Sequence, residues 1–253
     1  MSDTRPTSTT PVTEPPAREN APDDCGRRNK ADRDEWLQRT LSDIPAGRRI
    51  LDAGAGELRY KPLCAHLDYV SQDFAQYDGR GDGVGLHGGN WDCSKVDITC
   101  DITRIPEPNA SFDAVMCIEV LEHVPAPVEA LRELVRVLRR DGTLVITAPF
   151  CALTHQSPYF FHTGFSRYFY EHWLGQMGVR IDDLTYNGNY FEYLGQELRR
   201  LPSVGKQYVG TTATTDETSA LATVLKLLGR LSRGDHGSEQ FLAYGLCIRG
   251  TKR

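Results

Sequence analysis

Residues 50–56, Ile-Leu-Asp-Ala-Gly-Ala-Gly, decide the fold that the sequence predicts. Aliphatic residues lead to an acid, and a Gly-x-Gly turn follows, whose backbone can approach a ligand without obstruction by Cβ atoms. Dinucleotide-binding turns carry a third glycine, but Arg59 stands at that position. Asp52, two residues before Gly54, instead suits a ligand with a cationic amino group. The alternative is an incidental glycine turn in an α/β protein.

Outward from this turn, strand and helix patterns alternate over short connections, which favours a doubly wound, mostly parallel sheet. After the strand that ends at Asp52, we expect strands at 67–73, 96–100, 112–118, from Gly142 to Pro149, 179–186 and 241–248. Helices are expected at 32–44, 127–139, 167–177, 192–200 and 217–231. The apolar stripe of 217–231 is expected to be core packing, with membrane contact as the alternative.

Composition limits the class of protein. The 253 residues are long enough for one large domain, and no run of about 18 apolar residues predicts a transmembrane helix. The N-terminus lacks the apolar segment of a secretory signal. A net charge of -5 argues against a broad nucleic-acid interface. Seven scattered cysteines without a CxxC pair are typical of reduced thiols, so we expect a cytoplasmic protein.

The first thirty residues differ from the rest of the chain. They are rich in Pro, Ser, Thr and charged residues and hold almost no aliphatic side chains. Such a segment cannot bury enough apolar surface to offset its ordering entropy. We therefore predict a disordered tail over 1–30 and a single domain over 31–253, with a helical insertion at about 188–235.

Acidic residues end three consecutive predicted strands. Asp73 follows Asp52 by twenty-one residues, at a position where a carboxylate can accept both hydroxyls of a ribose. Asp101 ends the third strand and could accept from an adenine amino group. Carboxyl ends of parallel strands share one edge of the sheet, where open α/β sheets bind ligands. The three acids together predict a nucleoside-binding crevice, although each alone could be a solvated loop residue.

Four segments carry a resemblance to a known family: ILDAGAGE (50–57), YVSQDF (69–74), CDITRIPEPNASFDAVMCIEVLEHV (100–124) and ALRELVRVLRRDGTLVITAPF (130–150). In order and spacing, they resemble motifs of class I S-adenosylmethionine-dependent methyltransferases, nearest to the methyltransferase type 11 group. The resemblance covers 48–149. It implies a Rossmann-like sheet of seven strands, mostly parallel with an antiparallel last strand, and S-adenosylmethionine as the cofactor.

The resemblance also assigns residues to the methionine part of the cofactor. Gly54 and Gly56 are expected to pass it, and Asp52 to lie near its ammonium group. Glu119 follows the fourth strand and is expected to line the site below the sulfonium. One departure concerns Glu57 and the residue after it, which stand where many relatives have a third glycine, so the turn could be tighter there.

The same resemblance assigns four further residues to the adenosine part of the cofactor. Asp73 is expected to hold the ribose, and Phe74 to pack against the adenine. Asp101 and Ile102 are expected to contact the adenine edge. The helix usual between the second and third strands is replaced by a segment with six glycines over 79–89. That density predicts a mobile loop, either a lid over the cofactor or a surface insertion.

Proton transfer from an acceptor calls for a base with a pKa near neutrality, and histidine suits that role. His155 and His162 lie in the aromatic segment after the fifth strand and are our first candidates, with His123 next. For each, the alternative is a structural histidine bonded to backbone. No HExxH motif, clustered Cys/His spacing or EF-hand loop occurs, so no metal site is expected.

The sequence thus predicts a cytoplasmic methyltransferase with a small-molecule acceptor: a sugar, polyketide, quinone precursor or other secondary metabolite. Aromatic residues after the fifth strand, with the helical insertion, are expected to build the acceptor pocket. An RNA or protein methyltransferase and a catalytically silent cofactor-binding scaffold remain alternatives. We expect no nucleic-acid partner and no membrane span. A homodimer is compatible with the sequence, which does not fix the oligomeric state or the methylated atom.

Overall fold

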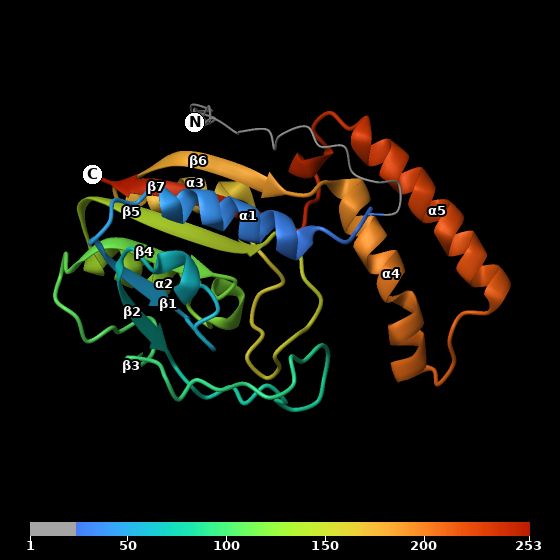
Figure 1. The fold of residues 1–253 in the computed structure, drawn as a ribbon, viewed down its shortest axis with the longest axis horizontal. Helices are drawn as coiled ribbons and strands as arrows, with labels where there is room; N and C mark the ends of the chain where they lie inside the picture. The colour runs from blue at the N-terminus through green and yellow to red at the C-terminus, as the bar shows by residue number, and fades with distance from the viewer. Residues whose placement is uncertain (1–23) are drawn as a thin grey trace, which may run out of the picture.

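The computed structural model describes residues 24–253, and the disorder predicted for 1–23 lies outside that range. One sheet runs in the order β3-β2-β1-β4-β5-β7-β6 (Figure 1). Its strands are β1 (Arg49–Ala53), β2 (Asp68–Asp73), β3 (Ile98–Thr99), β4 (Phe112–Ile118), β5 (Leu138–Pro149), β6 (Val179–Asn187) and β7 (Gly245–Lys252). β7 is antiparallel to both β5 and β6, whereas the other pairs are parallel. The predicted seven-stranded, mostly parallel sheet is confirmed.

Helices cover both faces of the sheet. They are α1 (Asn29–Ser42), α2 (Pro127–Val137), α3 (Arg167–Gln176), α4 (Tyr190–Tyr208) and α5 (Thr215–Arg233), with short 3₁₀ turns η1 (Lys61–Cys64), η2 (Leu121–His123) and η3 (Ser238–Gln240). α4 and α5 follow β6 and form an antiparallel pair that projects beyond the sheet (Figure 1). No helix in the described part of the chain is long and apolar enough to cross a membrane.

Alternation along β1 decides which side chains meet which helices. Ile50 packs with Trp36 and Leu37 of α1 on one face. Leu51 and Ala53 pack on the other face, in the core that includes α2 and α3. Asp52 must therefore share the α1 face with Ile50. This placement matters for the site, because it turns the Asp52 carboxylate away from the α2 side of the sheet.

Some predicted boundaries were wrong. The helix predicted to extend to residue 139 ends at Val137, because Leu138 already pairs with Phe112 at the start of β5. The last strand begins at Gly245 rather than at residue 241, and Phe241 is exposed. The third strand shortens to two residues. At these three element ends, pairing with neighbouring strands sets the boundary, whereas the local sequence pattern does not.

The predicted apolar stripe on α5 is not core packing over most of its length. Of the helix, only Leu228 and Gly229 are buried. Val224, Leu227 and Leu231 are exposed. The prediction failed because α5 contacts mainly α4 and not the sheet, so one face of a two-helix layer remains uncovered (Figure 1).

The predicted tail over 1–30 was also wrong for residues 24–30, of which Asn29 and Lys30 already belong to α1. Cys25 is buried, and its backbone carbonyl accepts a hydrogen bond of 2.7 Å from Nε of Arg199 on α4. The Gly26 amide donates to the Glu192 carboxylate at 2.7 Å. A Cβ at Gly26 would lie 2.2 Å from the Gln196 nitrogen, so only glycine fits. These residues dock on α4 and belong to the fold.

The glycine-rich loop over 79–89 is docked as well. Leu86 forms a bridge with His155, donating its amide to the Thr154 carbonyl and accepting from the Gln156 amide. Gly81 and Gly85 lie so close to this segment that Cβ atoms would meet the backbone carbonyls of residues 157 and 154 at 1.8 and 2.3 Å. The glycines therefore allow close backbone contact, and the loop helps to fix the segment that carries His155.

Candidate functional site

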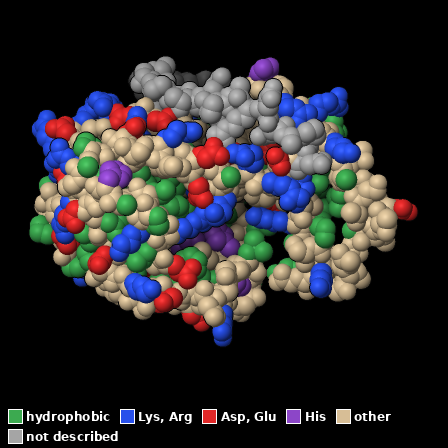
Figure 2. Space-filling model, in the orientation of Figure 1, with side chains coloured by type: hydrophobic (Ala, Val, Ile, Leu, Met, Phe, Trp, Pro, Cys, Tyr) green, Lys and Arg blue, Asp and Glu red, His purple; other side chains and the backbone are tan. Residues whose placement is uncertain are grey.

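A cavity of about 860 Å³ opens at the carboxyl ends of β1, β2 and β4. Its wall includes seven of the eight cofactor-binding residues predicted from the sequence: Gly54, Gly56, Asp73, Phe74, Asp101, Ile102 and Glu119. Its volume falls within the range of about 300–1,000 Å³ common for ligand pockets. Figure 2 shows histidine side chains inside the hollow on this face, with basic and acidic side chains around it. The cavity therefore lies at the edge of the sheet that was predicted from the three acids at strand ends.

The glycine turn is held against the next strand. The amides of Gly54 and Ala55 both donate to the Gln72 carbonyl, at 2.8 and 2.9 Å. Gly54 and Gly56 have φ of 80° and 50°, a conformation that favours glycine. A Cβ at Gly54 would lie 2.3 Å from Val120 Cγ2, and one at Gly56 would lie 2.6 Å from Trp91. Both glycines are required by close packing as well as by backbone conformation.

Asp73 joins the glycine turn to the end of β2. Its carboxylate accepts from the amides of Gly56 and Ala75, at 2.9 and 2.8 Å. The side chain is buried in the cavity wall. A carboxylate has about four lone-pair positions, and the Cys93 thiol also approaches Oδ1 at 4.0 Å, so acceptor capacity remains on Oδ2 for a further donor, such as a hydroxyl of a ribose. The geometry suits the role that the resemblance gave it.

The opposite end of this wall is formed by Phe74, Asp101 and Ile102. Phe74 makes an edge contact with Tyr159, with ring centroids 5.0 Å apart. One oxygen of Asp101 accepts from the amide and hydroxyl of Thr103, both at 2.8 Å. Asp101 also lines the cavity. An aromatic face and an acid therefore border the same space.

Asp52 does not line the cavity. Its carboxylate is buried on the α1 face and accepts a hydrogen bond of 2.6 Å from the Tyr69 hydroxyl. Burial raises the pKa of Asp52 to about 7, although the Tyr69 hydrogen bond acts in the opposite direction. The geometry therefore gives no support to the expected contact with the cofactor ammonium group. The alternation of side chains along β1 already indicated this placement, because Asp52 must share a face of the sheet with Ile50.

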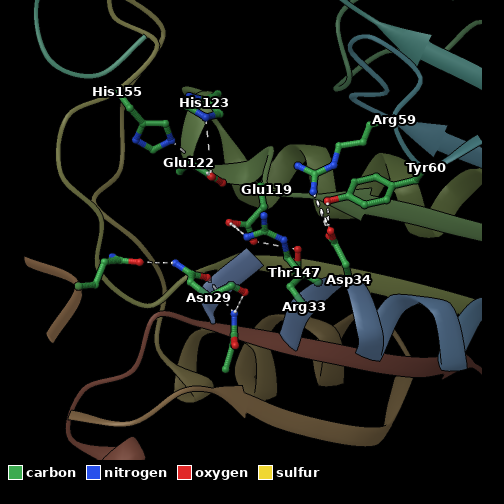
Figure 3. Close-up of polar contacts among 12 residues, drawn as sticks. Asn29, Arg33, Asp34, Arg59, Tyr60, Glu119, Glu122, His123, Thr147 and His155 are labelled. Carbon is green, nitrogen blue, oxygen red and sulfur yellow. Dashed lines mark hydrogen bonds and ion pairs between the residues drawn. The ribbon is translucent and has the colours of Figure 1, made fainter. Parts of the chain in front are cut away.

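Glu119 lies at the end of β4 and faces the cavity (Figure 3). It accepts from the Thr147 hydroxyl at 2.8 Å and pairs with Arg33 of α1 at 2.9 Å. Its φ of 56° places a non-glycine residue in the left-handed region, a conformation that costs of order 1–3 kcal/mol. The ion pair and the hydroxyl hold the carboxylate in position despite that strain.

Two of the three predicted histidines line the cavity. His123 and His155 lie in T-shaped contact, with ring centroids 4.7 Å apart. Burial and the neighbouring His155 lower the pKa of His123 to about 4, and burial also lowers the pKa of His155. Both rings are therefore neutral at neutral pH. His162 is not part of the wall; it packs against Phe165, at a centroid distance of 5.5 Å. This placement removes it as a candidate base.

Glu122 is a residue of the cavity wall that sequence reasoning missed. It is fully buried on η2, between the two histidines in Figure 3. Within residues 24–253, neither carboxylate oxygen has a hydrogen-bond partner. Burial and the nearby Glu119 carboxylate raise the pKa of Glu122 well above its ordinary value. The signal available in the sequence was its place beside His123 in the segment Leu121-Glu122-His123.

The sequence analysis also missed Arg33, Tyr77 and Trp91, which line the cavity. Tyr77 and Trp91 flank the glycine-rich loop, and their rings lie 5.9 Å apart in edge contact. Aromatic residues at both ends of a glycine-rich insertion were the signal that its ends border the cavity. Arg33 gave no such signal, because its role depends on a contact with Glu119 across the fold.

A second cavity of about 320 Å³ adjoins the first and shares Glu119, His155 and Gln156 with it. Gln196, Glu197 and Arg200 of α4 line its far side. Part of the helical insertion thus borders this space, as expected. The expected aromatic pocket is less complete: Tyr159 and Phe161 line the main cavity, but Tyr168 is exposed on α3. The wall of the second cavity combines these polar and charged side chains with apolar ones such as Leu86 and Leu153.

Comparison with known proteins agrees with this architecture. Residues 51–146 match the family model described as a methyltransferase domain. That segment begins in β1 and ends in β5, so it contains the glycine turn, Asp73, Asp101 and Glu119. Over this segment the chain is similar to methyltransferase domains, and one of the relatives it matches is named as S-adenosylmethionine-dependent.

Relatives share the fold and this segment. A protein of Mycolicibacterium smegmatis named "Probable S-adenosylmethionine-dependent methyltransferase" is 30% identical over 124 residues, covering 46% of this chain and 44% of its own. A demethylmenaquinone methyltransferase of Beutenbergia cavernae is 33% identical over 129 residues, covering 47% and 51%. The chain thus spans about half the length of these curated relatives. A methyltransferase structure from Archaeoglobus fulgidus has a TM-score of 0.53 at 16% identity, covering 86% and 92%, and shows the fold alone.

Proposed function

We propose that this chain transfers a methyl group from S-adenosylmethionine to a small-molecule acceptor. The observation that carries the proposal is the 860 Å³ cavity at the carboxyl edge of the sheet, whose wall joins the glycine turn to Asp73 and Asp101. A second cavity meets it at Glu119 and His155, which would offer an acceptor a place beside the cofactor. The net charge of -5 favours a small molecule over a nucleic acid.

The residues of the wall fit the proposed cofactor. Gly54 and Gly56 bring the backbone of the turn to the cavity, and Asp73 keeps an unused lone pair in a buried wall. Phe74 and Ile102 offer apolar surface beside Asp101. A sulfonium supplies an already activated methyl group, so the protein's main task is to hold acceptor and methyl in line.

The remaining chemistry concerns the proton of the acceptor. Glu119, His123 and His155 meet where the two cavities join, and both imidazoles are neutral at neutral pH. His155 lines both cavities, and its Nε2 is the atom that would accept a proton from a bound acceptor. We retain His155, with His123 beside it, as the proton acceptor of the proposed reaction. His162 has no access to either cavity wall.

The cytoplasmic location also remains a proposal. All seven cysteines are free thiols, including Cys151 on the surface and Cys93 in partial exposure. Free, exposed thiols are usual in a reducing compartment, which supports the proposal without deciding it.

The test is turnover with a panel of hydroxylated and amino small molecules, measured as release of S-adenosylhomocysteine. The Asp73→Asn variant should lower that release at least tenfold, because the amide cannot accept from both the Gly56 and Ala75 amides. Asp97→Asn is the matched control, since Asp97 bonds Ser71 outside the cavity. If the protein methylated RNA or protein but none of the small molecules, the proposed class of acceptor would be wrong. Cofactor binding without turnover on any acceptor would support a silent scaffold.

A further inference from the structure

Three acceptor atoms converge at the junction of the two cavities. Glu122 Oε1 lies 3.7 Å from His123 Nε2 and 4.0 Å from His155 Nε2. The ligating atoms of the three residues all lie within 4.8 Å of one another. Figure 3 shows both rings turned toward the Glu122 carboxylate. Three electron-rich groups thus face one common point. Two of them come from η2, and the third comes from the loop after β5.

Both imidazoles present a lone pair to that point. Nδ1 of His123 lies 2.6 Å from the Tyr159 carbonyl, and Nδ1 of His155 lies 2.8 Å from the Leu153 carbonyl. A carbonyl can only accept, so each Nδ1 must carry the hydrogen and donate it. Nε2 of each neutral ring is therefore unprotonated. Backbone carbonyls that fix the ring tautomer in this way are typical second neighbours of metal-binding histidines.

No donor in the described part of the chain satisfies the group. His123 Nε2 and both Glu122 oxygens are buried without a hydrogen-bond partner there. Arg33, whose charge acts on Glu122, forms its ion pair with Glu119. A proton shared within the group would need heavy atoms at about 2.7–3.2 Å, shorter than either separation. Buried acceptors left this way are costly, and a bound cation would satisfy all three of them.

We propose that Glu122, His123 and His155 bind a divalent first-row transition-metal ion. Two imidazole nitrogens and one carboxylate are a ligand set that Zn²⁺ and related ions take in catalytic sites, with a further position left open. Bonds of about 2.0–2.2 Å place tetrahedral ligands about 3.3–3.6 Å apart, so a ligand pair separated by up to 4.8 Å would close by about 1 Å on binding. Mg²⁺ prefers oxygen ligands, so the two nitrogens disfavour it. This proposal runs against the sequence-based expectation of no metal site.

The open side of the proposed site faces the two cavities, because all three ligands line the main one and His155 lines both. Resting on the proposed function, the inference therefore names the acceptor class: a molecule with a hydroxyl group that reaches the ion from the second cavity. A bound cation lowers the pKa of such a hydroxyl. Its proton leaves to water, the oxygen forms a bond to the methyl carbon, and the carbon–sulfur electron pair stays on sulfur. In this arrangement His155 holds the ion instead of the proton.

The experiment measures metal binding directly, on the full chain after chelator treatment and dialysis. Calorimetric titration with Zn²⁺ should give one ion per chain, and Co²⁺ should add visible absorption bands of a nitrogen- and oxygen-bound ion. His155→Gln and Glu122→Gln should each weaken Zn²⁺ binding at least tenfold, and Mg²⁺ should bind far more weakly. Circular dichroism and melting curves check that each variant is folded.

His162→Gln is the matched control. His162 is a nearby histidine whose Nε2 is also buried without a partner among the described residues, but it lies outside the proposed ligand set. Its substitution should leave the Zn²⁺ dissociation constant within about two-fold. Absence of a stoichiometric Zn²⁺ site, or equal affinity in the folded His155→Gln variant and the control, would overturn the proposal.

Activity then separates this inference from the proposed function. Removal of metal should lower methylation of a hydroxyl acceptor at least tenfold, and Zn²⁺ should restore it, with cofactor affinity unchanged. Full turnover in the metal-free protein would refute the metal site and leave the methyltransferase intact. A specific Zn²⁺ site in a protein that methylates none of the acceptors would refute the proposed function alone.

Discussion

Replacement of Asp52 by asparagine should stabilise the protein, and more so at alkaline pH. Asp52 is fully buried on the α1 face of the sheet, and burial raises its pKa from an ordinary value of 3.8 to about 7. Asparagine has the same shape, keeps a carbonyl oxygen that can accept from the Tyr69 hydroxyl, and cannot ionise. The variant therefore removes the cost of a buried charge without opening a cavity.

The sign follows from proton linkage. Because the folded pKa is raised, the contribution of Asp52 to stability is complete below about pH 4 and is lost as pH rises toward 7. The loss is about 1.4 kcal/mol per pH unit over that window, and it ends once the folded state is also ionised. The difference in free energy of unfolding between the Asp52→Asn variant and the parent protein should therefore increase by about 2–3 kcal/mol, in favour of the variant, from pH 5 to pH 8.

Urea unfolding at pH 5 and pH 8 measures this difference. Asp97→Asn is the control, because hydrogen bonds from Ser71 lower the pKa of Asp97 and its replacement should show no such gain. Affinity for S-adenosylmethionine should stay within about two-fold in the Asp52→Asn variant, since Asp52 does not line the cavity. A gain below about 0.5 kcal/mol, or a tenfold loss of cofactor affinity, would refute the placement of this carboxylate.

Three further predictions concern the turn, the N-terminal segment and the histidines. Gly54→Ala should unfold at least about 1 kcal/mol more easily than Gly47→Ala, because both have positive φ but only the first brings Cβ against Val120; equal losses in urea would contradict this. A chain that starts at residue 29 should melt about 4–8 °C below one that starts at residue 24, since the Gly26 contact with the Glu192 carboxylate is lost; coincident calorimetric melts would contradict it. His155→Ala should lower turnover about 10²-fold or more, and the second histidine variant, His162→Ala, less than two-fold; a larger loss in the latter would return that histidine to the site.

Local pattern predicted most of the sheet and the edge that carries the cavity. The strand patterns placed β1, β2, β4 and β6 to within about two residues, because alternation and apolar runs are properties of the segment itself. The order of acids at strand ends then predicted Asp73 and Asp101 in one wall. Asp52 was misplaced because its position in the motif was weighed above the alternation that fixes its face.

Contacts between distant residues set the features that the sequence did not predict. Cys25 docks on Phe191 and Arg199, more than 160 residues away, and nothing in its local composition signals this contact. Glu122 and His155 are brought together because the segment after β5, which carries His155, also donates the amides of Phe161 and His162 to the Glu122 carbonyl. Metal-site motifs are recognised by spacing on one element, so a group drawn from η2 and a loop escapes such a search.

Titration of the full chain with S-adenosylmethionine in a calorimeter tests the central claim most directly. One molecule should bind per chain, with a dissociation constant in the micromolar range, and Asp73→Asn should weaken that binding at least tenfold while Asp97→Asn leaves it within about two-fold. Absence of binding to the folded protein, or equal affinity in both variants, would contradict the assignment of the cavity to this cofactor.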